Sequence, residues 1–240
     1  MAEGFFGQLL GRVEGGRGWF IGGVSPTPLF SFRGMRYLLI DHHALVRVLA
    51  CNFVPKGYFF YSTFTLPQGK DVLLIDRKLI HRYGISSSKF VNYRRRKKGL
   101  ATVRYLRTGR LGVLLATHGK HVFFENENVR DVRLQPFTVH GYSVGVSNGH
   151  AVVRIHREAY NQLRRRFTEL ACHRSVDWWC RTFQRFPFEG YKAVVEQQFT
   201  LLRQVNALRK RAKLSRVDWK PCIRTQRRPR RSFSSVSVSR

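Results

Sequence analysis

Apolar residues recur at helical spacing soon after position 70, and the pattern predicts two helices joined by a tight turn. Asp71 can cap the first helix. The apolar side chains of that helix return every three or four residues, at Val72, Ile75, Leu79 and Tyr83. Gly84 is a natural left-handed stop, and Ile85 can fill the angle between this helix and the next.

The second helix is expected to start from a hydroxyl cap at Ser86 or Ser87 and to run to Lys98, before Gly99. We expect it to bury Phe90 against the rest of the protein. Its other positions are mostly basic and supply the first group of candidate nucleic-acid contacts: Lys89, Asn92, Arg94, Arg95, Arg96, Lys97 and Lys98.

Two strand-like runs follow, at residues 100–107 and 111–117, with turn residues Thr108, Gly109 and Arg110 between them. Two helices that meet at a glycine-containing turn, followed by a basic hairpin, resemble a winged helix–turn–helix. The resemblance is one of fold and covers residues 70–117. It implies that the second helix enters the major groove of DNA and that the hairpin lies near the backbone. Ordinary helix packing can produce the same pattern, and that alternative stays open.

The rest of the chain predicts a small antiparallel sheet followed by helices. Alternating positions predict five short strands, at residues 121–125, 129–134, 137–140, 142–146 and 150–156. Asn148-Gly149 is a strong hairpin signal between the last two strands. Helical periodicity then predicts three helices, from residue 158, over 176–183 and over 191–214. Upstream, residues 37–49 fit a short strand or a helix start, and 58–66 fit a strand.

The predicted fold class is α+β, with a winged-helix-like unit, a small antiparallel sheet and a C-terminal helical region that ends in a basic tail. Four parts follow from the composition: a flexible glycine-rich arm (1–34), the winged-helix-like unit (35–117), the sheet with its helices (118–214) and a disordered basic and serine-rich tail (215–240).

Charge identifies the expected partner. The formal net charge is +30, from 44 Lys and Arg against 14 acidic residues, so a polyanion is needed to neutralise the chain. Nucleic acid fits best, and the lack of an apolar run of about 18 residues argues against a membrane partner. The 19 Phe, 9 Tyr and 4 Trp can build a sizeable core, which excludes a disordered polycation. We expect an intracellular protein of the cytoplasm or nucleoid, and the sequence leaves organellar targeting open.

The chemistry of base recognition assigns roles to the candidate contacts. Three side chains opposite Phe90 are expected to contact base edges: Asn92, Arg95 and Arg96. The other cations of the helix would hold phosphates, together with the hairpin residues Arg104, Arg107 and Arg110. Tail cations would add affinity that is independent of sequence: Arg227, Arg228, Arg230 and Arg231. These roles predict a DNA-binding protein, such as a regulator or a plasmid or mobile-element replication factor.

Two other functions fit part of the pattern. A structural RNA-binding protein, such as a ribosomal or organellar ribosomal component, would also carry high charge and basic extensions. A metal-independent ribonuclease would need two histidines near a phosphodiester, and its candidates are His140, His150 and His156.

Other patterns for catalysis or metal binding are sparse. Residues 38–43 read Leu-Leu-Ile-Asp-His-His and resemble one motif of the DHH phosphoesterases, in which such side chains bind catalytic metals. That family also has aspartates upstream, whereas none precedes Asp41 here, and Asp41 can instead cap the next helix. The four cysteines include no Cys-x-x-Cys pair, so free thiols are expected. We expect no catalytic residue, metal or cofactor.

Overall fold

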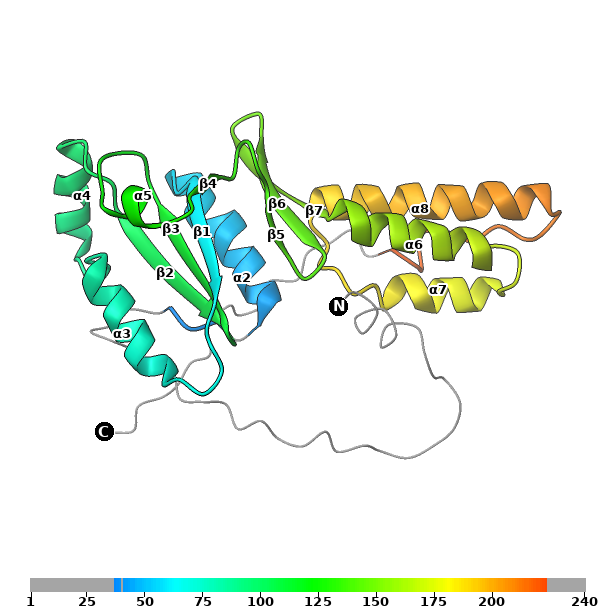
Figure 1. Cartoon of the computed structure of the whole chain (residues 1–240). Coiled ribbons are helices and arrows are strands. Elements are labelled where there is room, and N and C mark those ends of the chain that lie inside the picture. Colours follow the sequence, from blue (N-terminus) through cyan, green and yellow to red (C-terminus); the bar gives the residue numbers. More distant parts are fainter. Residues whose placement is uncertain (1–36, 40, 224–240) are drawn as a thin grey trace, which may run out of the picture.

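The computed structural model describes residues 37–39 and 41–223 of the 240-residue chain. These residues form an α+β fold with seven helices, α2 to α8, and two small antiparallel sheets (Figure 1). The predicted fold class, with a small antiparallel sheet and C-terminal helices, is confirmed at this level. The predicted N-terminal arm at 1–34 lies outside the described residues.

The first sheet has four strands in the order β2-β3-β1-β4. Its strands are β1 (Phe60–Thr65), β2 (Val103–Thr108), β3 (Leu111–Ala116) and β4 (Arg130–Asp131). Strands β2 and β3 form the predicted hairpin, in which Gly109 adopts a φ of 55° in the two-residue turn. Strand β3 also pairs antiparallel with β1, so β3 is a central strand covered on both faces.

Helices cover both faces of this sheet. On one side lie α3 (Val72–Arg82), α4 (Lys89–Lys97) and the short α5 (Phe123–Asn126), and on the other lies α2 (His42–Val48) (Figure 1). A π-helical turn (Leu49–Phe53) and a 3-10 turn (Val54–Lys56) continue α2. Alternation along β3 separates two cores, because Leu114 packs with α3 whereas Val113 and Leu115 pack with α2.

The larger core continues through a three-stranded sheet into the C-terminal helices. The sheet consists of β5 (Phe137–Val139), β6 (Tyr142–Ser147) and β7 (His150–Ile155), and the helices are α6 (Arg157–Leu170), α7 (Val176–Gln184) and α8 (Lys192–Arg211). Asn148 and Gly149 have φ angles of 50° and 76°, as the predicted two-residue hairpin turn requires. Gln197 of α8 bonds both backbone groups of Ile155 and so fixes α8 against β7.

Sequence predictions outside the helix–turn–helix are wrong in three places. The strand expected over 129–134 is limited to β4, and a turn follows it at 132–134. A strand was expected over 121–125, but Phe123–Asn126 form the helix α5, in which Phe123 packs fully buried against Tyr83. Residues 215–223, expected to belong to a disordered tail, pack instead on α8. Their buried side chains are Val217, Cys222 and Ile223. The remainder of the predicted tail, from 224, lies outside the described residues.

Candidate nucleic-acid interface

The predicted junction between the two helices is confirmed in detail. The Asp71 carboxylate caps α3 by accepting from the backbone N–H of Leu73 at 2.8 Å. Gly84 has a φ of 58°, a conformation that costs a residue with a Cβ, and Ile85 is fully buried beside it. These local signals fix the angle at which α4 leaves α3.

The ends of α4 lie close to the predicted positions. Ser88, rather than Ser86 or Ser87, is the N-cap, and its hydroxyl accepts from the backbone N–H of Val91 at 3.3 Å. The helix ends at Lys97, and Gly99 follows with a φ of 70°. Ser87 instead donates its hydroxyl to the Gly84 carbonyl at 2.8 Å, which closes the turn between the helices.

The orientation of α4 about its axis is opposite to the predicted one. Phe90, expected to be buried, is 79% exposed, whereas Asn92, expected to contact a base, is 7% exposed. The Asn92 amide donates to the Ser87 carbonyl at 3.0 Å and so braces the start of the helix. Residues two positions apart lie on nearly opposite sides of a helix. The prediction that Phe90 and Asn92 lie on opposite sides is therefore confirmed, but it is Asn92, and not Phe90, that faces the core.

The core beneath α4 explains this orientation. Tyr83 and Ile85 are each 1% exposed and already fill the apolar space where α3 and α4 meet. These two side chains supply the apolar contacts at the junction, and α4 turns the polar residues Asn92 and Arg95 towards them. Arg95, one helical turn after Asn92, is half-buried on the same side, and its guanidinium lies near Gly84.

Arg95 lines a basic pocket between α3, α4 and the segment before α5. The pocket has a volume of about 530 Å³, and its other cationic side chains are Arg82 and Lys120. The Nε atom of Arg95 is buried and has no hydrogen-bond partner in the described chain. Glu125 is the only acidic side chain of the lining. The pocket therefore offers positive charge to an anion.

His121 at the edge of this pocket adds no positive charge at neutral pH. Its burial, together with the nearby charge of Arg95, lowers the pKa of the imidazole. The Nδ1 atom accepts from the backbone N–H of Phe123 at 3.0 Å, as a neutral ring can. The arginines and Lys120 therefore carry the positive charge of the pocket.

The outer face of α4 is basic and aromatic. Tyr93 is 54% exposed, and the Lys97 ammonium lies 5.1 Å from the centre of its ring. Five predicted contacts are exposed on this helix and its C-cap: Lys89, Arg94, Arg96, Lys97 and Lys98. None of the five forms a salt bridge within the part of the chain that the structure describes.

The hairpin arginines, predicted to hold phosphates, are used within the protein. Arg107 binds Asp76, with an Nη2–Oδ2 distance of 3.1 Å. Arg104 donates to the Ile85 carbonyl at 3.2 Å, and Arg110 to the Leu66 carbonyl at 2.9 Å. Arg107 is thus committed to an internal ion pair, whereas Arg110 remains exposed. The four predicted tail contacts lie outside the described residues: Arg227, Arg228, Arg230 and Arg231.

Only two of the three candidate histidines lie near each other, because the backbone N–H of His156 donates to the carbonyl of Gly141, next to His140, at 2.6 Å. His140 lies in the turn before β6 and stacks on His42 of α2, with ring centres 4.0 Å apart. His150 begins β7 at the far end of the β6–β7 hairpin, and His156 precedes α6. Burial, followed by the neighbouring histidines, lowers the pKa of His42 to about 4. The pairing of His140 with His42 was not foreseen, because His42 is remote in sequence.

The Asp-His-His segment has a structural use. Asp41 caps α2 by accepting from the backbone N–H of Ala44 at 2.7 Å, as the alternative interpretation expected. Across residues 37–39 and 41–223 no group of three or more His, Cys, Asp or Glu side chains is arranged to hold a metal. No disulfide joins any two of the four cysteines, all of which lie among the described residues. No helix among these residues is both long and apolar enough to cross a membrane.

Comparisons with known proteins do not supply a family. Neither the protein-family models nor the curated proteins with which we compared the sequence match it. The functional argument therefore rests on the charge, exposure and contacts of the residues described above.

The outward position of Phe90 predicts a small effect on stability. We expect Phe90→Ala to change the free energy of unfolding by less than about 0.5 kcal/mol, because a mostly exposed ring loses little on truncation. The matched control is Phe123→Ala, which removes a fully buried ring and should cost about 3–5 kcal/mol. Chemical denaturation measures both. Equal losses in the two variants would place Phe90 in the core.

Proposed function

We propose that this protein binds nucleic acid through the outer face of α4, and that duplex DNA is its preferred form. The order of elements supports a winged-helix arrangement. Helix α2 is followed by β1, then by α3 and α4, then by the β2–β3 hairpin, and β1 pairs with β3. In that arrangement the second helix of the pair enters the major groove.

The observation that carries the proposal is the concentration of unpaired cations on one short helix. The five exposed Lys and Arg side chains of α4 and its C-cap make no salt bridge within the described chain. Such cations repel one another unless an anion neutralises them, and contacts with phosphates release condensed counterions. The formal net charge of +30 points the same way.

The orientation of α4 revises which side chains would read the bases. Arg94 and Arg96 are both exposed but lie on nearly opposite sides of the helix. Arg94, on the side of Phe90, is the candidate for base edges, where arginine forms bidentate bonds with guanine, and Arg96 would hold a phosphate at the flank of the helix. Asn92 is occupied by its bond to Ser87 and braces the helix instead. Arg95, with Arg82 and Lys120, would hold a backbone phosphate beside the helix.

Exposed aromatic side chains support a second candidate, a structural RNA-binding protein. Phe90 and Tyr93 stand among the cations of α4, where an unpaired base could stack on either ring. A duplex would not use these ring faces.

Selection from randomised duplex DNA and structured RNA pools, at low and near-physiological salt, separates the two candidates. A duplex motif that persists at the higher salt supports the first, and preference for folded RNA supports the second.

Removal of three α4 cations gives the direct test. We expect Arg94→Ala/Arg96→Ala/Lys97→Ala to weaken binding to the selected nucleic acid by about 10- to 100-fold. The slope of log K against log salt should fall by about 2–3, because up to three phosphate contacts are lost. The affinity is measured by fluorescence anisotropy over a salt series.

The control variant removes the same charge from another surface. Lys210→Ala/Arg211→Ala/Lys220→Ala replaces three exposed cations at and beyond the C-terminal end of α8. If nucleic acid binds at α4, this control retains most of the affinity. Equal losses in the two triple variants would mean that only net charge matters, and α4 would then not be the binding site.

A further inference from the structure

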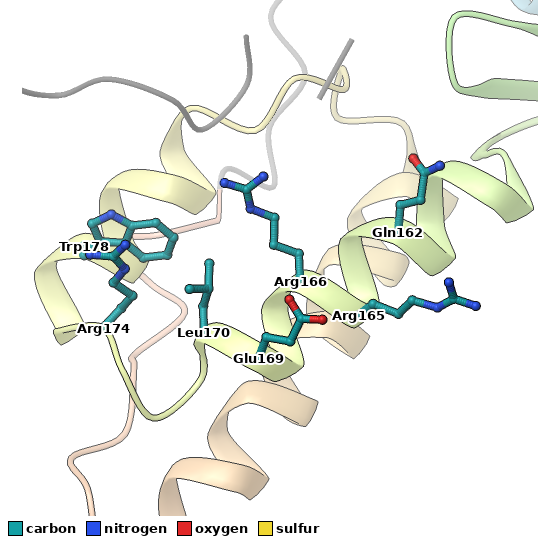
Figure 2. Close-up of a pocket in the computed structure, with 7 residues that line it drawn as sticks. All are labelled: Gln162, Arg165, Arg166, Glu169, Leu170, Arg174 and Trp178. Atoms are coloured by element: carbon teal, nitrogen blue, oxygen red, sulfur yellow. The ribbon is translucent and has the colours of Figure 1, made fainter. Parts of the chain in front are cut away.

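Helices α6 and α7 lie at the end of the molecule away from α4 (Figure 1). Their side chains line a second basic pocket. It has a volume of about 470 Å³ and is formed by α6, the start of α7 and the turn between them. Figure 2 shows its lining, in which Leu170 lies between the Trp178–Arg174 pair and Arg166. Pockets of this size hold small ligands or single groups of a larger one.

Charge in this pocket is strongly unbalanced. Arg165, Arg166 and Arg174 supply three cations, and Glu169 is the only acidic residue of the lining. Glu169 forms no salt bridge with an arginine among the described residues, whose three ion pairs all involve other side chains. The basic surface also continues around α6, because Arg164 and Arg165 line an adjoining hollow. An extended anion, rather than an isolated ion, matches this continuity.

The aromatic wall distinguishes this pocket from a simple cationic patch. Trp178 is half-buried, and the Arg174 guanidinium lies 5.3 Å from the centre of its ring. Trp179 holds the indole of Trp178 edge to face, with ring centres 5.0 Å apart. The Trp178 ring therefore packs against both Trp179 and Arg174, and arginine and indole planes are the surfaces on which unpaired bases stack.

We propose that this pocket binds an unpaired nucleotide segment of DNA or RNA. The base stacks on the Trp178–Arg174 pair, and Arg166 and Arg165, which follow one another along α6 on one side of that pair (Figure 2), hold successive phosphates of the same strand. A base within a duplex presents only its edges and cannot enter, so the ligand is single-stranded. This site goes beyond the proposed duplex contact at α4, since the two surfaces share no residue. Together they would let one molecule hold a duplex and an adjoining single strand.

Binding of a short single strand to the full-length protein tests the pocket. The probe is a labelled oligothymidylate of about 12 nucleotides, which lies within the site size of single-strand modules. We expect Arg165→Gln/Arg166→Gln to weaken its binding at least fivefold, and Trp178→Ala to do the same. The control, Arg181→Gln/Arg185→Gln, removes two exposed arginines of α7 and its C-cap outside the pocket and should retain the affinity. Trp178→Phe keeps an aromatic ring and should retain part of it.

The α4 triple variant separates this site from the proposed function. If the α4 triple variant loses duplex binding but still binds oligothymidylate, the result supports both the duplex site at α4 and the separate single-strand site in the pocket. If the pocket variants bind oligothymidylate as tightly as the parent protein, the pocket inference is overturned and the α4 proposal is untouched. If polyglutamate of equal charge displaces the strand as well as unlabelled oligothymidylate does, the pocket recognises acidic chains in general and the inference also fails. If the α4 triple variant binds duplex as tightly as the parent protein while the pocket variants lose oligothymidylate binding, the α4 proposal fails and the pocket inference stands.

Discussion

Asp76→Ala is expected to destabilise the protein by about 3–5 kcal/mol, because it removes one partner of a buried ion pair. Asp76 lies on α3 and is completely buried against the first sheet. Its Oδ1 atom accepts from the Tyr105 hydroxyl at 2.7 Å, and its Oδ2 atom accepts from Arg107 Nε at 3.1 Å. The substitution leaves the buried Tyr105 hydroxyl without its acceptor, and it removes the carboxylate that neutralises the partly buried Arg107.

Two tyrosines, Tyr105 and Tyr37, lie close to the Asp76 carboxylate, and both have raised pKa values. Burial, followed by the carboxylate of Asp76, raises the pKa of Tyr105, and the same two causes raise the pKa of Tyr37 to about 12. Both phenols therefore stay protonated, and Tyr105 donates to Asp76. Tyr37 also stacks on Tyr105, with ring centres 5.5 Å apart, so loss of Asp76 disturbs the packing of the smaller core.

Urea denaturation monitored by far-ultraviolet circular dichroism measures this effect as a shift of the midpoint. Tyr105→Phe serves as the milder comparison, since it removes one hydrogen bond and should cost about 1 kcal/mol. The double variant Asp76→Leu/Arg107→Met removes both charges and should recover part of the loss. A cost below about 1 kcal/mol for Asp76→Ala would mean that the pair contributes nothing beyond ordinary packing.

The parts of the fold that the sequence predicted are those encoded by local chemistry. Asp71 caps α3 and Gly84 ends it because both act on backbone groups within a few residues. The Asn148-Gly149 turn likewise depends on two adjacent residues that tolerate a positive φ. Such signals needed no knowledge of the rest of the chain, and the structure places them where they were expected.

The predictions that failed depended on residues far away in sequence. Phe90 is apolar and was therefore expected on the inner side of α4, but Tyr83 and Ile85 already form the apolar core at that junction. Residues 121–125 have the composition of a strand, yet burial of Phe123 favours a helical turn. Arg107 looked like a free cation because its partner, Asp76, lies 31 positions earlier.

Charge alone did not separate structural from binding arginines. Within the described chain, the exposed arginines of α4 have no ion pair, whereas Arg209 of α8 is 4% exposed and bonded to three carbonyls. In the sequence Arg209 begins a run of cations, and the composition of this run resembles that of a basic tail. Only the fold reveals that it acts as an internal brace, and its substitution is expected to affect stability rather than charge-driven binding.

Arg209→Ala is expected to destabilise the protein by about 2–4 kcal/mol. Its Nη1 atom donates to the carbonyls of Ala171 and Arg174 at 2.9 and 2.6 Å, and its Nε atom donates to the Ser215 carbonyl at 2.7 Å. One side chain thus ties the end of α6, the turn before α7 and the segment after α8. Truncation leaves these carbonyls without a donor, at about 1–3 kcal/mol for each that stays buried.

Lys210→Ala is the matched control, since it removes the adjacent, exposed cation of the same helix and should change stability by less than about 0.5 kcal/mol. Arg209→Lys keeps the charge but replaces a forked, planar donor with a single ammonium, so it should restore only part of the stability. Because Arg174 belongs to the proposed single-strand pocket, Arg209→Ala should also weaken oligothymidylate binding under conditions in which the protein remains folded. Duplex binding at α4 should be retained there. If both variants at position 209 were as stable as the parent protein, the three bonds would contribute no net stability, and the position of Arg174 would have to be maintained by the Trp178 contact alone.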